Sequence, residues 1–176
     1  MTPTATALPA LAPKDALEDK LEQLLPRADE EPTALHRAMR HAVFPAGKRI
    51  RPRLLITVAQ ACAAGEGELE LALHAGCAIE FIHSASLVHD DLPCFDDAET
   101  RRGRPTVHAH FGEALAVLAG DALLTRAFEV MAETPSRLSR RALRIVALLG
   151  QATGSRSGII GGQSLEEGTG KRGARP

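Results

Sequence analysis

The chain contains no tryptophan and no tyrosine, and phenylalanine occurs only five times among its 176 residues. The cores of β-sandwiches and barrels are enriched in aromatic and β-branched side chains, so this scarcity argues against both. The apolar content of 44% is supplied largely by Ala, Leu, Ile and Val, which suit closely packed helices. The composition therefore predicts an all-α fold.

Cysteine is also scarce, and its three positions do not form a recognisable pattern. Cys62, Cys77 and Cys94 are odd in number and widely spaced. Such spacing fits neither a disulfide framework nor a zinc site. Cys62 and Cys77 stand in apolar helical segments, where we expect buried free thiols.

A large charge of one sign and long apolar runs are both missing. The formal net charge is −1, which argues against nucleic acid or an anionic membrane as the main partner. No run approaches the roughly 18 apolar residues of a membrane span, so none is expected. Residues 1–13 lack the basic start and apolar centre of a secretory signal, and we expect a cytoplasmic protein.

Apolar residues recur at helical spacing along most of the chain, and no segment shows sustained two-residue alternation. The predicted helices cover about 14–25, 32–43, 52–64, 68–91, 113–133, and a sixth from Thr134-Pro135-Ser136 to about 153. We therefore expect one domain of about six helices over 14–167. Residues 1–13 and the glycine-rich tail 168–176 are predicted to be disordered.

The segment His89-Asp90-Asp91-Leu92-Pro93-Cys94-Phe95-Asp96-Asp97 places four carboxylates where an apolar helix gives way to a loop. So much like charge is unfavourable unless a cation neutralises it. Ligation by oxygen alone suits Mg²⁺, which takes one or two carboxylates and fills its shell with water and phosphate oxygens. Taken alone, the segment fits a solvated acidic turn equally well.

Two basic clusters accompany the acidic segment. Arg101-Arg102-Gly103-Arg104 follows it, and Gly47-Lys48-Arg49-Ile50-Arg51 opens an earlier helix. Guanidinium groups bind phosphate oxygens bidentately, and the amides at a helix start favour anions. A magnesium site beside these clusters suggests a diphosphate ligand, whereas each cluster by itself is typical of a solvated surface.

Three histidines need separate interpretations. His83 lies two helical turns before Asp90, so both side chains project from one face of the predicted helix. This placement favours ligand contact over the usual role of a lone histidine in a core. His108 and His110 have no third ligand nearby in the sequence, and we interpret them as structural.

These motifs together resemble the polyprenyl synthetases, the trans-isoprenyl diphosphate synthases. Residues 81–96 resemble the first aspartate-rich region of that family, and Arg101-Arg102-Gly103 follows it at the expected place. Gly47-Lys48-Arg49-Ile50-Arg51-Pro52 resembles the Gly-Lys-x-x-Arg element. Two further stretches that match are Leu118–Leu124 and Gly161-Gly162-Gln163. The resemblance runs in collinear order from about residue 35 to Glu167.

The resemblance implies a type I isoprenoid synthase helical bundle, truncated here, and a Mg²⁺-dependent prenyltransferase. Such an enzyme condenses isopentenyl diphosphate with dimethylallyl, geranyl or farnesyl diphosphate, and the full-length form is expected to be a homodimer. Asp90, Asp91 and Asp96 would be catalytic, with Asp90 and Asp96 holding the metal on the allylic diphosphate. Arg101 would bind that diphosphate, and Gln163 would lie near it. The isopentenyl diphosphate would be held by Lys48, Arg51, His83 and Arg102.

The product length is also predicted by resemblance. Ala85 and Ser86 precede Asp90 by about one turn and would point into the product cavity. Bacterial farnesyl synthases of this subfamily commonly place an aromatic residue at the position of Ala85, so alanine leaves room for a longer chain. The spacing Asp-Asp-Leu-Pro-Cys-Phe-Asp resembles the geranylgeranyl diphosphate synthases of plants and carotenoid-making bacteria. Geranylgeranyl diphosphate is therefore the expected product, with farnesyl diphosphate as the alternative.

The sequence departs from the family pattern in its last part. A second aspartate-rich motif and a Lys-Thr pair, which the family needs, do not occur among these 176 residues. We therefore expect little or no synthase activity from the chain as given. Two other hypotheses are a non-catalytic regulatory or dimer-partner subunit and an unrelated helical terpene cyclase or condensing enzyme that shares an aspartate-rich motif. Lys48 and Arg51 argue against the cyclase, because cyclases bind no isopentenyl diphosphate.

Overall fold

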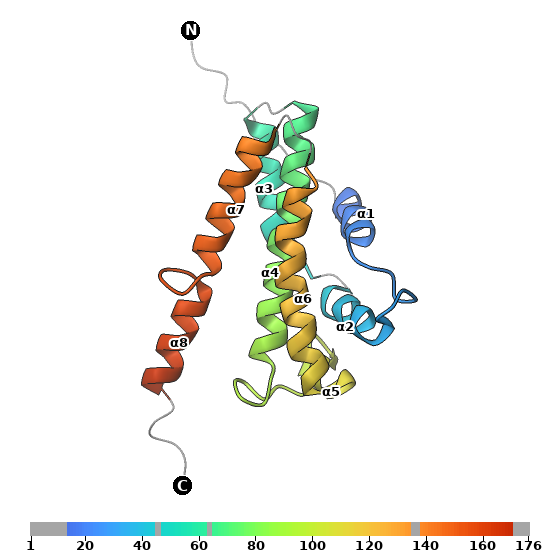
Figure 1. The fold of residues 1–176 in the computed structure, drawn as a ribbon, viewed down its shortest axis with the longest axis vertical. Coiled ribbons are helices and arrows are strands. Elements are labelled where there is room, and N and C mark those ends of the chain that lie inside the picture. Colours follow the sequence, from blue (N-terminus) through green and yellow to red (C-terminus); the bar gives the residue numbers. More distant parts are fainter. Residues whose placement is uncertain (1–13, 45–46, 63–64, 135–137, 171–176) are drawn as a thin grey trace.

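The computed structural model describes residues 14–44, 47–62, 65–134 and 138–170, and these residues form an all-α bundle. Two long helices, α4 (Glu66–Asp90) and α6 (Glu113–Ala132), lie along each other at its centre (Figure 1). Their facing surfaces form the middle of the core, where Phe81 and Leu123 are completely buried. Residues 1–13 and 171–176, predicted to be disordered, lie outside the described residues.

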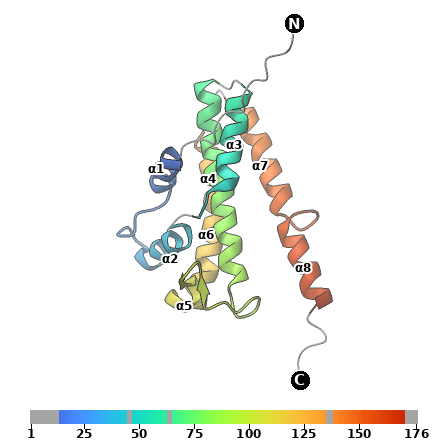
Figure 2. The same ribbon diagram turned by 180° about the vertical axis from the view of Figure 1, so that it is seen from behind.

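Shorter helices surround this central pair. The N-terminal helices α1 (Lys14–Leu24) and α2 (Thr33–Val43) lie on one side of it, and α7 (Ser139–Thr153) and α8 (Ile159–Gly170) lie on the other (Figures 1 and 2). The helix α3 (Ile50–Ala61) packs against α4, where Gly76 allows close approach: a Cβ there would lie 3.0 Å from Cβ of Pro52.

The predicted all-α class is confirmed, and the six predicted helices are present with shifted ends. The third begins at Ile50 rather than at about residue 52, because a proline in the first helical turn needs no amide partner. Two helices were not predicted: α8 and the single-turn α5 (Val107–Phe111). The helix α8 extends to Gly170, so the predicted tail over 168–176 begins inside a helix.

A small hairpin was also missed. The strands β1 (Thr100–Arg101) and β2 (Arg104–Pro105) pair antiparallel, with Arg101 opposite Arg104. The two residues between them, Arg102 and Gly103, have positive φ values of 53° and 76°. Positive φ at both loop residues is what the favoured two-residue hairpin turn of type I′ requires. Strands of two residues are too short to show alternation in a sequence, so no pattern indicated them.

The central helix and the cysteines complete the description of the core. By length and composition, α4 could cross a membrane, but 72% of the relevant window is buried inside the fold, as in the core helix of a soluble protein. All three cysteines are free. Cys77 is buried, as predicted, and burial raises the pKa of its thiol to about 12. The prediction for Cys62 is wrong, because this residue follows the end of α3 and is exposed.

Candidate functional site

The acidic segment forms a tight turn at the end of α4. The backbone amide of Asp96 donates to the carbonyl oxygen of Asp90 at 2.9 Å, and the amide of Ala98 donates to that of Asp91 at 3.1 Å. The chain therefore folds back and places Asp96 beside Asp90. Burial raises the pKa of the Asp90 carboxyl, and the negative charge of Asp96 raises it further. These two carboxylates form an acidic pair whose negative charge is only partly offset by the nearby Arg101.

Asp91, next to Asp90, has a different environment. Its carboxylate is buried and accepts hydrogen bonds from Nε of Arg101 at 2.9 Å and from Nη2 at 2.6 Å. This bidentate geometry is the strong form of an arginine–carboxylate pair. Asp91 thus orients Arg101, whose guanidinium remains partly exposed beside Asp90 and Asp96. Asp91 is an anchor for Arg101 rather than a free metal ligand.

Hydrogen bonds hold the hairpin that carries Arg101 and Arg102 against the C-terminal end of α2. Nη1 of Arg104 donates to the carbonyl oxygen of Phe44 at 2.8 Å, and its Nη2 lies 3.2 Å from Nδ1 of His41. Nε2 of His41 lies 2.9 Å from the carbonyl oxygen of Pro105. These contacts fix the loop at Arg102, whose guanidinium lies across Gly47.

Four predicted ligand residues from three separate segments line one pocket. This basic pocket has a volume of about 640 Å³. It is lined by Lys48 from the turn before α3, Arg51 from the first turn of α3, His83 from α4 and Arg102 from the hairpin. Burial lowers the pKa of the His83 imidazole, and the nearby charge of Arg51 lowers it further. The pocket therefore concentrates positive charge where a dianionic or trianionic group could be held.

Two residues of the same pocket were not predicted from the sequence. Arg49 and Glu80 line it from the buried side and form an ion pair of 2.7 Å. Arg49 also adopts the left-handed conformation, with φ 49°, which costs about 1–2 kcal/mol for a residue with a Cβ. The sequence signal was its place within Gly47-Lys48-Arg49-Ile50-Arg51, but nothing there distinguished a buried arginine from two exposed basic residues.

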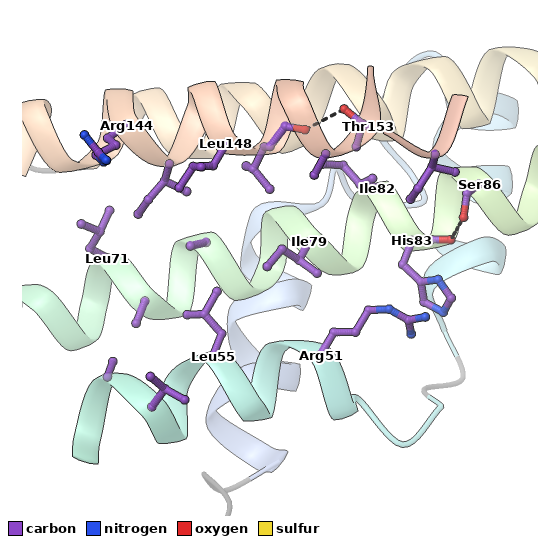
Figure 3. Close-up of a pocket in the computed structure, with 18 of the residues that line it drawn as sticks. Arg51, Leu55, Leu71, Ile79, Ile82, His83, Ser86, Arg144, Leu148 and Thr153 are labelled. Atoms are coloured by element: carbon purple, nitrogen blue, oxygen red, sulfur yellow. Dashed lines mark hydrogen bonds between the residues drawn. The ribbon is translucent and has the colours of Figure 1, made fainter. Parts of the chain in front are cut away.

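An apolar cavity of about 970 Å³ adjoins the basic pocket. Aliphatic side chains of α3, α4 and α7 line it, and Arg51 and His83 stand at one end (Figure 3). Asp90 also reaches this cavity, so His83 and Asp90 share one face of α4, as their spacing predicted. The arrangement can hold the anionic head group of a ligand in the basic pocket and its apolar chain in the apolar cavity.

The two residues predicted to set the product length, Ala85 and Ser86, lie in different environments. Ser86 lines the apolar cavity, and its Oγ donates to the carbonyl oxygen of His83 at 3.0 Å. Ala85 is completely buried and is not among the residues that line the cavity. The structure therefore brings Ser86 to the cavity wall and does not bring Ala85 there.

Gln163 lies on α8, which carries none of the other predicted ligand residues. The first residue of that helix, Ile159, reaches the apolar cavity, but Gln163 does not line it. The two remaining histidines have structural roles, as expected. His108 is buried with Nε2 3.0 Å from the carbonyl oxygen of Ala98, and the ring of His110 stacks on His41 at 5.2 Å.

The acidic pair fits Mg²⁺ by its donor chemistry. Within the described part of the chain, no group of three or more His, Cys, Asp or Glu residues could hold a metal ion by itself. Magnesium does not need such a group, because one or two carboxylates with water and phosphate oxygens satisfy it. Asp90 and Asp96 supply two adjacent carboxylates, and burial, followed by the charge of Asp96, raises the pKa of Asp90. A bound cation would offset both effects.

Comparison with known proteins identifies the family. The polyprenyl synthetase profile matches residues 32–172. The chain is 47% identical over 157 residues to a geranylgeranyl diphosphate synthase of Cereibacter sphaeroides, covering 86% of this chain and 54% of that protein. A geranylgeranyl diphosphate synthase of Rhodobacter capsulatus is 45% identical over 157 residues, with the same coverage.

A solved structure agrees with the sequence comparison. The apo FPP/GFPP synthase of Zymomonas mobilis superposes with a TM-score of 0.82 at 36% identity, covering 92% of this chain and 57% of that one. The chain thus spans about half the length of the relatives that it matches. Its all-α bundle is the isoprenoid synthase fold, and the chain belongs to the polyprenyl synthetase family.

Proposed function

We propose that this chain carries the diphosphate-binding part of a prenyltransferase that condenses isopentenyl diphosphate with an allylic diphosphate. The observation that supports this most strongly is the convergence of Lys48, Arg51, His83 and Arg102 on one pocket. Residues from three separate segments meet there, and the pocket opens beside an apolar cavity. An isoprenyl diphosphate has the same division between an anionic head and an apolar chain.

The residues supply distinct parts of the reaction. The basic pocket would hold the diphosphate of isopentenyl diphosphate, and Arg101 would stabilise negative charge on the departing allylic diphosphate. Asp90 and Asp96 would hold Mg²⁺, which supplies further neutralisation of that leaving group. The carbon–oxygen bond of the allylic substrate breaks, the isopentenyl double bond forms the new carbon–carbon bond, and a proton leaves. The apolar cavity would exclude water from the reacting carbons.

We propose geranylgeranyl diphosphate as the product of the complete enzyme. The names of the relatives from Cereibacter sphaeroides and Rhodobacter capsulatus support this choice. Farnesyl diphosphate is the alternative, and the name of the Zymomonas mobilis structure supports it. Product analysis of an intact homologue decides between them: a 15-carbon diphosphate as the sole product would overturn the longer one.

For the 176-residue chain by itself we propose binding without turnover. Its one aspartate-rich segment offers Asp90 and Asp96, and the second such motif of the family does not occur in this sequence. Magnesium-dependent turnover by the purified chain would refute this proposal. The alternative of a non-catalytic dimer-partner subunit predicts co-purification with a full-length synthase, which a fragment without that role would not show.

Calorimetric titration with inorganic pyrophosphate tests the proposed binding site. We expect the wild-type chain to bind pyrophosphate and the double variant K48Q/R51Q to lose affinity by about 100-fold or more, because each lost charge–phosphate contact is worth about 1.5–3 kcal/mol. Both residues are exposed, so thermal stability should change little. Equal affinity in the two proteins would contradict the assignment.

Assembly and location belong to the same proposal. We propose a homodimer for the full-length form, which rests on the resemblance to the family. We also propose a cytoplasmic location, which the near-neutral charge and ordinary apolar content support. Size-exclusion chromatography with light scattering tests the first, and cell fractionation tests the second. A monomeric full-length protein, or recovery in the membrane fraction, would contradict them.

A further inference from the structure

The buried arginine beneath the basic pocket is the centre of a larger network. The Arg49 side chain is 1% exposed and bonds to three different segments of the fold. Nη1 donates to Glu80 on α4 at 2.7 Å, Nε donates to Glu18 on α1 at 3.0 Å, and Nη2 donates to the carbonyl oxygen of Val43 on α2 at 2.9 Å. The guanidinium therefore joins the start of α3 to three other helices.

The conformation of Arg49 determines how its neighbours are presented. The residue is left-handed, and it immediately precedes the first residue of α3. Its side chain enters the interior, whereas Lys48 and Arg51 on either side remain exposed and line the basic pocket. An arginine in this conformation is strained, so the contacts of its guanidinium must hold the turn in place.

Glu80 explains why the anchor must be positively charged. It lies one helical turn before His83 and lines a pocket built to take anions. An unpaired carboxylate there would repel a diphosphate and would be costly to bury. The ion pair with Arg49 neutralises this carboxylate and, through the same bond, ties the turn that carries Lys48 and Arg51 to the helix that carries His83.

We infer that Arg49 is a positioning residue for diphosphate binding: through Glu80, Glu18 and the carbonyl of Val43 it holds Lys48 and Arg51 against His83 without touching the ligand itself. This inference rests on the proposed function of the basic pocket. It assigns to Arg49 a role that its neighbours in the sequence do not share, because they bind and it anchors.

The test compares Arg49→Gln with a matched control, using pyrophosphate titration and thermal melts. Arg126 is the control: its guanidinium also links helices, donating to the carbonyl oxygen of Leu24 at 2.7 Å and pairing with Glu133 at 2.7 Å. It does not line the basic pocket. Both R49Q and R126Q are expected to melt earlier. Measured well below both melting points, R49Q should bind pyrophosphate at least tenfold more weakly, and R126Q should stay within twofold of wild type.

The double variant R49Q/E80Q separates positioning from simple repulsion. It removes the unpaired carboxylate, so its melting temperature should recover partly, while its affinity should stay at least tenfold below wild type because the turn is still unanchored. Recovery of wild-type affinity would overturn the inference, since repulsion by Glu80 would then explain R49Q completely. If R49Q yields no folded protein, the double variant decides by the same criterion.

The outcome for wild type distinguishes the two proposals. If wild type fails to bind pyrophosphate, or if K48Q/R51Q binds as wild type does, the proposed function of the pocket fails. If wild type binds through Lys48 and Arg51 but R49Q binds equally well, the pocket stands and only the positioning role of Arg49 is overturned.

Discussion

The basic pocket and the acidic turn each contain an arginine–carboxylate pair, and the two pairs differ in what they leave available. Beneath the basic pocket, Arg49 and Glu80 are 1% and 5% exposed. Beside the acidic turn, Asp91 is 5% exposed, but Arg101 is 35% exposed. The first pair is closed to solvent and can only hold the structure. The second pair orients an arginine that can still meet a ligand.

The same contrast separates the two surfaces as a whole. The basic pocket draws on α3, α4 and the hairpin, with a buried network behind it. The acidic turn is a short continuous segment held by its own backbone hydrogen bonds, and it supplies Asp90 and Asp96 as neighbouring carboxylates. One surface is assembled from distant residues, and the other is local.

The largest expected difference concerns stability. Arg49→Gln should lower the free energy of unfolding by about 3–5 kcal/mol, because the buried carboxylate of Glu80 would lose its charged partner. Arg101→Gln should cost about 1–2 kcal/mol, because removing an arginine at the surface lets water reach Asp91. Urea denaturation of both variants measures this. Equal losses would show that the two pairs do not differ as described.

The next prediction concerns the acidic pair and Mg²⁺. Magnesium should raise the affinity of the chain for pyrophosphate about tenfold, or about 1.4 kcal/mol, and Asp90→Asn and Asp96→Asn should each abolish this gain. Asp97→Asn is the control, because Asp97 is left-handed with φ 51° and asparagine tolerates that conformation. Titrations with and without the metal measure the gain. An undiminished gain in D90N would remove Asp90 from the metal site.

A smaller effect is expected where Gly47 faces Arg102. A Cβ at this position would lie 2.5 Å from Nη1 of Arg102 and 2.9 Å from its Cζ. Gly47→Ala should displace that guanidinium and weaken pyrophosphate binding about threefold. Stability should change by about 0.5 kcal/mol or less, because the end of a flexible side chain can move aside.

Gly150→Ala provides the comparison for this substitution. Nothing lies within 4 Å of the added Cβ in α7, so the helix should gain about 0.5–1 kcal/mol with unchanged affinity. If G47A loses stability while its affinity is unchanged, Gly47 serves the fold rather than the placement of Arg102.

The smallest effect is a pH dependence from the basic pocket. Burial lowers the pKa of His83, and so do the charges of Arg51, Arg102 and Arg101, partly offset by Glu80. The folded state therefore disfavours the imidazolium, and stability should fall as the pH drops below the ordinary histidine value of about 6.5. Urea denaturation at pH 7.5 and 5.5 should show that the free energy of unfolding falls less for His83→Gln than for wild type. His41, whose pKa is also lowered by burial, should account for part of the remainder.

Much of this arrangement was predictable, for reasons that differ between elements. The helical period showed the long helices, and two turns between His83 and Asp90 placed both on one cavity wall. The hairpin at Arg102 and the short α5 were not predictable, because elements of a few residues carry no period. Ala85 missed the cavity wall for a different reason: consecutive residues of a helix point in different directions, so Ser86 faces the cavity and Ala85 faces the core.

The sequence by itself determined the all-α class, the family and the set of charged residues, because these depend on local periodicity and on the order of motifs. Only the tertiary structure decided what each charge does. Lys48, Arg49 and Arg51 are basic residues within one four-residue stretch, yet Arg49 is buried against Glu80 while the other two are exposed at the pocket. Burial and partners set the role of a charge, and both come from helices that are distant in the sequence.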